Sequence, residues 1–112
     1  MNIQKKKEDR FKFLHKIYEV SNGRMNIMVN GEIIGKELGF DRGYSADIYY
    51  YLNEEGLTEP MGAGIRLTIT HFGVREIEEA LTSPNKQTEY FPPVFNILQI
   101  EKNFKLVRMR FL

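Results

Sequence analysis

The sequence contains no cysteine among its 112 residues. Disulfides, thiolate metal sites and a cysteine nucleophile are therefore excluded, and this composition suits a reducing compartment, so we expect a cytoplasmic protein. No apolar run approaches the roughly 18 residues that a membrane-spanning helix needs, so we expect no membrane association. The basic start, MNIQKKKEDRFKF, lacks the apolar stretch of a secretory signal.

Residues suited to catalysis are scarce as well. The two histidines, His15 and His71, stand alone, without a second histidine at metal-ligand spacing. The segment EIEEAL is typical of a charged helix face rather than of an acid–base pair in a cleft. Gly62 and Gly64 are not followed by the Lys-Ser/Thr pair of a phosphate-binding loop. We therefore expect no enzyme activity, no catalytic residues, no metal site and no cofactor.

Charge is abundant but unevenly distributed along the chain. Residues 1–16 contain six Lys or Arg and two acids, residues 17–100 contain six and twelve, and residues 101–112 contain four and one. The two ends are therefore basic, at +4 and +3, and the middle carries −6, although the whole chain carries only +1. Nucleic acids are bound largely by neutralising phosphates, so this distribution bears on any DNA-binding function.

The length and a hydrophobic content of 42% are those of one small globular domain. Apolar spacing predicts a first helix from Asp9 to about Val20, and residues 1–8 are expected to form a flexible basic arm. Asn30 is the expected N-cap of a second helix, which Gly39 ends.

A third helix is expected to begin at a cap formed by Asp41 or Ser45 and to end at Gly56. Residues 57–59 and 65–69 alternate across a glycine-containing tip, as the strands of a β-hairpin do. Thr70 is the expected cap of a fourth helix, which ends at Ser83-Pro84. The chain is therefore predicted to be mainly α with a small β-hairpin, an α+β fold. The compact domain is expected to span residues 9–83.

The C-terminal fifth of the chain allows two interpretations. Residues 84–93 contain Pro84, Pro92 and Pro93 and are expected to form an extended linker. In residues 94–112, apolar side chains alternate in a way that favours a strand, although a helix stays open. An apolar segment at the edge of so small a domain is expected to contact a partner, and we predict a homodimer formed through it.

Two local patterns stand out, at the end of the third helix and after the hairpin. The first consists of Leu52, Gly56 and Leu57, and the second of Ile69, Thr70 and Gly73. They resemble the ends of the recognition helix and of the wing in the winged helix-turn-helix domains of the MarR/PadR-like group of bacterial and archaeal regulators. The stretch THFGVREIEEALTSPNKQTEYFPP is also similar to the end of a widespread group of uncharacterised prokaryotic winged-helix proteins. The resemblance covers residues 9–93 and implies a winged helix-turn-helix fold.

The resemblance also implies a DNA-binding transcriptional regulator, with the third helix in the major groove of double-stranded DNA and the wing on its backbone. Arg42 would then pair with a guanine edge or a phosphate. Tyr44 and Ser45 would donate hydrogen bonds to phosphates, and Asp47 would accept one from a cytosine amino group. Arg66, on the wing, would contact phosphate or the minor groove.

The acidic middle of the chain favours an alternative function. A net charge of −6 over residues 17–100 disfavours a groove reader unless the basic ends compensate for it. The same scaffold would then be a protein–protein interaction module, with Tyr50 and Tyr51 in the core or at an interface. A sensor with a ligand pocket at a dimer interface is a third possibility, without a sequence feature that favours it.

Overall fold

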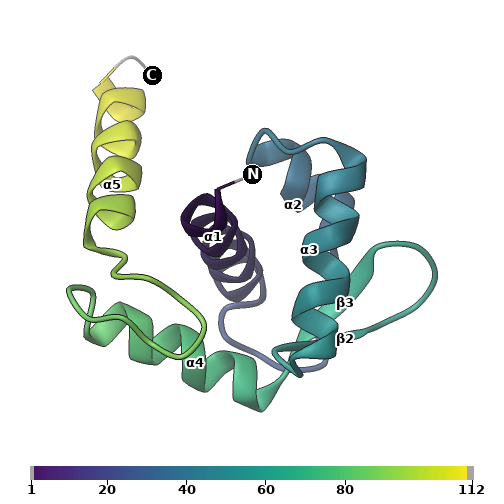
Figure 1. The fold of residues 1–112 in the computed structure, drawn as a ribbon. Helices are drawn as coiled ribbons and strands as arrows, with labels where there is room; N and C mark the ends of the chain where they lie inside the picture. Colours follow the sequence, from purple (N-terminus) through teal and green to yellow (C-terminus); the bar gives the residue numbers. More distant parts are fainter. Residues whose placement is uncertain (1, 111–112) are drawn as a thin grey trace.

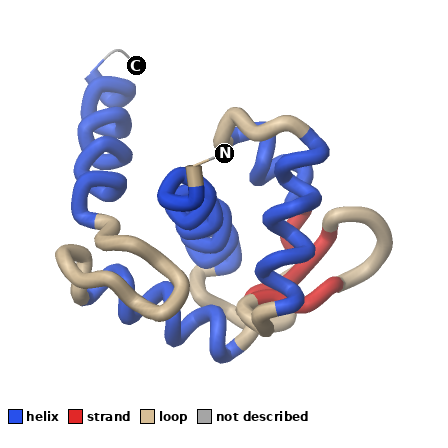
Figure 2. The backbone as a smooth tube through the Cα atoms, in the orientation of Figure 1, coloured by secondary structure: helices blue, strands red, loops and turns tan. Residues whose placement is uncertain are grey.

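The structure is a computed structural model that describes the backbone of residues 2–110 and the side chains of residues 2–102. Within this part of the chain there are five helices and a small three-stranded antiparallel sheet, which confirms the predicted α+β class. The hairpin lies at one edge of the molecule and α5 at the opposite edge (Figures 1 and 2). The elements, in chain order, are α1 (Ile3–Ser21), β1 (Val29–Asn30), α2 (Gly31–Glu37), α3 (Arg42–Glu54), β2 (Thr58–Pro60), β3 (Arg66–Ile69), α4 (His71–Thr82) and α5 (Phe95–Arg110).

Side-chain caps begin three of these helices where the sequence predicts them. The Asn30 side chain accepts hydrogen bonds from the first backbone N–H groups of α2. Asp41, and not Ser45, caps α3 by accepting from the Tyr44 N–H at 2.8 Å. The Thr70 hydroxyl accepts from the Gly73 N–H at 3.0 Å. Each cap pairs N–H groups that have no partner inside the helix.

The sheet has the order β1-β3-β2, with β3 in the centre. The predicted hairpin is confirmed, with β2 and β3 paired in the register Thr58↔Ile69 and joined through residues 61–65. At its tip, Gly62 and Gly64 take φ values of 86° and 73°, which side chains disfavour. The brief strand β1 pairs with β3 on its other edge, in the register Val29↔Leu67.

The first helix lies in the middle of the fold (Figure 1) and supplies much of the core. Its inward face buries four large side chains completely: Phe11, Phe13, Leu14 and Ile17. They belong to one cluster with buried residues of α3, the sheet, α4 and the segment before α5. Each fully buried side chain of this kind stabilises the fold by about 1.5–3 kcal/mol, so α1 is the element that holds the others together.

The start of α1 differs from the sequence prediction. The helix begins at Ile3 rather than at Asp9, because the Asn2 side chain accepts hydrogen bonds from the N–H groups of Gln4 and Lys5. The boundary between a basic arm and the domain at residue 9 is therefore wrong. The lysines of residues 5–7 lie on the first turns of a helix.

The end of the chain also differs from the prediction. Phe95–Arg110 form the helix α5, so the helix left open for residues 94–112 is confirmed and the favoured strand is wrong. Residues 111–112 lie outside the described part of the chain. The proline-containing segment before it packs onto the body, since Phe91 and Val94 are buried and the Val94 N–H donates to the Pro84 carbonyl at 2.8 Å. No helix in the described residues is both long and apolar enough to cross a bilayer.

Candidate nucleic-acid interface

Helices α2 and α3 form a tightly packed pair around a short turn. A methyl group at Gly35 would overlap the side chain of Ser45, so only glycine allows this approach of the two helices. The turn is closed by the Phe40 N–H, which donates to the Gly35 carbonyl at 2.8 Å, and by Gly39, whose φ is 79°. The Phe40 and Tyr44 rings then meet edge to face, with centroids 5.2 Å apart. This packing determines which side of α3 faces outward.

Ser45 was predicted to donate to a phosphate, and this prediction is wrong. Its side chain points into the α2–α3 contact, against Gly35, and the residue is only 1% exposed. Its hydroxyl has no hydrogen-bond partner among the residues that the structure describes. Ser45 is therefore a packing residue: its small size, rather than its polarity, lets α3 approach α2.

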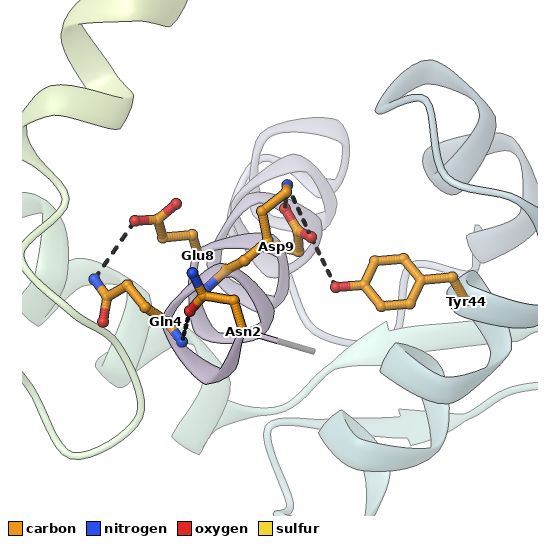
Figure 3. A network of polar contacts seen from close by, with 6 residues as sticks. Asn2, Gln4, Glu8, Asp9 and Tyr44 are labelled. Atoms are coloured by element: carbon orange, nitrogen blue, oxygen red, sulfur yellow. Dashed lines mark hydrogen bonds and ion pairs between the residues drawn. The ribbon is translucent and has the colours of Figure 1, made fainter.

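Tyr44 links α3 to α1 instead of pointing at a ligand. Its hydroxyl donates to a carboxylate oxygen of Asp9 at 2.7 Å, and the Lys5 ammonium lies 3.0 Å from the other oxygen (Figure 3). Burial, then the hydrogen bond to Asp9, raises the pKa of Tyr44 to about 12. Because a tyrosine hydroxyl has one proton to donate, the prediction that Tyr44 donates to a phosphate is wrong for this arrangement.

Three of the five predicted contact residues are exposed. The Arg42 side chain is 78% exposed, and its Nε lies 3.9 Å from a carboxylate oxygen of Glu32. Asp47 is exposed on α3. Arg66 is exposed at the start of β3, and its guanidinium donates to the Ala63 carbonyl at 3.2 Å, across the hairpin tip. These three side chains stay available for a ligand.

The outward face of α3 combines tyrosine with acidic side chains. Tyr50 is 65% exposed, and Asp47 and Glu54 are exposed on the same helix. Tyr51 is half-buried, and the Arg10 guanidinium stacks over its ring at 3.6 Å. Such a cation–π contact contributes about 0.5–2 kcal/mol and holds α1 against α3. Tyr51 therefore has the partly buried position predicted for the pair, whereas Tyr50 lies outside the core, and an interface role for it stays a prediction.

A groove between α1 and α3 contains basic residues that the sequence interpretation placed elsewhere. It has a volume of about 190 Å³ and is lined by Lys6 and Arg10 from α1 and by Tyr44, Asp47 and Ile48 from α3. The flexible arm expected for residues 1–8 gave no reason to place Lys6 beside α3. Asn2 as an N-cap and the four-residue spacing of Lys6 and Arg10 were the available signals.

His15 makes the other contact of interest between helices. It stacks on Phe11, and its two ring nitrogens lie 3.9 Å from a Glu19 oxygen and 3.6 Å from a Glu101 oxygen. The described residues hold no group of three or more His, Asp or Glu side chains that could bind a metal ion. The contact between His15 and Glu101 joins α1 to the second turn of α5.

Comparisons of the chain with protein-family models, with curated proteins and with solved structures found no match.

Proposed function

We propose that this chain is a cytoplasmic winged helix-turn-helix domain that binds double-stranded DNA as a transcriptional regulator. In this proposal α3 enters the major groove, and the β2–β3 hairpin lies on the backbone as the wing. The observation that carries the proposal is the close α2–α3 pair, packed at Gly35 and Ser45, which leaves one face of α3 exposed. Helix-turn-helix proteins read DNA with such an outward face of the second helix.

Arg42 is the strongest candidate for a base contact. It lies in the first turn of α3, where recognition helices contact base edges, and it is largely exposed. Its ion pair with Glu32 is long, at 3.9 Å, and Glu32 is itself 44% exposed. Surface ion pairs of this kind contribute about 0–1 kcal/mol, so DNA can replace Glu32 as the partner of Arg42 at little cost.

Phosphate contacts come from two sides of α3 in this proposal. On one side, Arg66 extends from the wing; on the other, Lys6 and Arg10 line the groove between α1 and α3. Helical Lys5 and Lys7 add two more cations at the same end of α1. The positive charge of this end offsets part of the negative charge in the middle of the chain. Each phosphate that these side chains neutralise releases counterions from the DNA, which favours binding.

A fluorescence anisotropy titration against a labelled duplex of mixed sequence at low salt tests the proposal. We expect binding at micromolar protein, and Arg42→Ala weakens it by about 1–3 kcal/mol where the arginine contacts a base. The matched control is Arg75→Ala, because Arg75 is exposed on α4, which is neither part of the α2–α3 pair nor of the hairpin. Folded protein that leaves the duplex unbound, or equal effects of the two substitutions, would overturn the proposal.

The exposed face of α3 favours a second function, a protein–protein interaction module. Asp47, Tyr50 and Glu54 present a tyrosine flanked by two carboxylates, which repels phosphates but suits a basic partner protein. In that case purification in the presence of nuclease recovers a stoichiometric partner. Tyr50→Ala then releases the partner, while Arg42→Ala leaves it bound.

A further inference from the structure

A groove is lined by residues of α1, of α5 and of the end of α2. Helix α5 lies on the side of the molecule away from the hairpin (Figure 1). The start of α5 is anchored, because Val94 is fully buried and the Phe95 N–H donates to the Pro84 carbonyl at 2.9 Å. The groove beyond this anchor has a volume of about 540 Å³. Its apolar lining consists of Leu38 from the end of α2 and of Ile97 and Ile100 from α5.

Ile100 is the apolar side chain of this groove that most needs a partner. It is 70% exposed, whereas Ile97, one turn earlier, is only 8% exposed and belongs to the core. Leaving a side chain of this size in water forgoes most of the stabilisation that its burial would provide. The apolar face of α5 therefore leaves the core between Ile97 and Ile100 and is exposed at Ile100.

Acidic side chains surround the apolar part of the groove. Glu8, Glu37 and Glu101 line it together with one cation, Lys12. Glu37 also pairs with Lys16 at 3.3 Å, yet acids outnumber bases among the lining residues. The groove thus suits an occupant that is both apolar and basic.

The C-terminal segment of the same sequence has this composition. Residues 102–112 contain four Lys or Arg and no acid, together with six apolar residues. The apolar positions Ile97, Ile100, Phe104 and Val107 follow one another at spacings of three, four and three. This spacing is typical of a seam between two packed helices.

The segment cannot fill the groove of its own chain. Helix α5 continues to Arg110, so position 110 lies about 15 Å beyond Ile100 along the helix axis at 1.5 Å per residue. Among the described side chains, α5 lines one wall of the groove with Asn96, Ile97, Ile100 and Glu101, and a continuous helix cannot turn back into a groove that it borders. An occupant from the same sequence must therefore come from another molecule.

We propose that the occupant is a second copy of this chain. Two α5 helices pack antiparallel about a two-fold axis, and the basic, apolar half of each lies in the acidic groove of the other. Such an interface is self-complementary, as closed dimers require. This proposal specifies the surface through which the predicted homodimer forms, and it does not depend on whether the chain binds DNA.

Sedimentation velocity of the full chain over a concentration series tests this surface. We expect a dimer at tens of micromolar, and Ile100→Asp raises its dissociation constant by about tenfold or more. The matched control is Gln99→Asp, which adds the same charge at an exposed position outside the seam and leaves the dimer intact. Because Ile100 is exposed in the single chain, its substitution leaves the folded monomer unchanged, which circular dichroism verifies.

A charge exchange tests the proposed orientation. Glu8→Lys weakens the dimer, and adding Arg108→Glu restores part of the loss if the C-terminal half of one copy meets the groove of the other. A full chain that is monomeric throughout the concentration series overturns the proposal. A dimer that Ile100→Asp and Gln99→Asp affect equally overturns it too, because the contact then lies elsewhere.

Discussion

Replacing Tyr44 by phenylalanine tests the contact that fixes α3 against α1. The substitution keeps the ring and removes the hydroxyl that donates to Asp9 at 2.7 Å. Asp9 is only 2% exposed, and the substitution leaves it with the ion pair to Lys5, whose side chain is 61% exposed. A hydrogen bond to a charged group contributes about 1.5–3 kcal/mol to stability. We therefore expect Tyr44→Phe to lower the free energy of unfolding by an amount in this range.

Urea unfolding followed by circular dichroism measures the effect. With a slope of about 1–3 kcal/mol per molar urea for a small domain, the loss moves the midpoint downward by roughly 1 M. Tyr50→Phe is the matched control, since it removes the same atom from a residue of α3 that is 65% exposed. The control should change stability by less than about 0.5 kcal/mol. Equal midpoints for the two variants would refute the role given to the Tyr44–Asp9 contact.

Three further predictions concern the same small core. Gly35→Ala should lower the free energy of unfolding by about 1–3 kcal/mol, because the added methyl group overlaps Ser45. Adding Ser45→Gly should recover part of that loss in urea titrations. If the effects of the two substitutions simply add, the two residues are not in direct contact. Thr70→Ala should lower the free energy of unfolding by about 1 kcal/mol, because it removes the side-chain cap of α4. An unchanged thermal unfolding temperature would show that the cap does not stabilise the fold. The pKa of Tyr44 is raised to about 12 in the folded state from 10.0. Its contribution to stability is therefore fully present below pH 10 and is lost as the pH rises toward 12; Tyr44→Phe should remove this part of the alkaline loss.

Local signals along the chain were sufficient to predict much of the fold. Asn30 and Thr70 act as caps because a side-chain oxygen reaches N–H groups two or three residues ahead, a distance that the sequence alone determines. The hairpin likewise follows from alternation around Gly62 and Gly64. Such features depend on neighbours within a few residues, so a single sequence is enough to find them.

The errors at the candidate site have a different origin. Tyr44 and Ser45 both lie near the start of α3, where exposure is the default expectation for polar residues. Tyr44 is engaged by Asp9, 35 positions earlier in the sequence, and Ser45 is covered because Gly35 leaves space for it. Burial of this kind arises from tertiary contacts, and helical periodicity does not predict which residues make them.

The C-terminal helix was mispredicted because its sequence satisfies two periods at once. Alternate residues from Val94 to Ile100 are largely apolar, which favours a strand, while Ile97 and Ile100 also match the spacing of a helix face. What separates the two outcomes is the anchor at Pro84, whose carbonyl accepts from two N–H groups at the start of α5. This contact joins the first residue of the predicted linker, residues 84–93, to the segment that follows it.

Amide chemical-shift mapping during titration with a short duplex tests the proposed DNA-binding function most directly. We predict that the largest shifts occur at Arg42 and Asp47 on α3, at Arg66 on the β2–β3 hairpin, and at Lys6 beside the groove between α1 and α3. They should decrease as salt is added, because phosphate contacts are weakened by competing counterions. Shifts confined to α4, or a spectrum that the duplex leaves unchanged, would contradict the proposal that α3 and the wing read DNA.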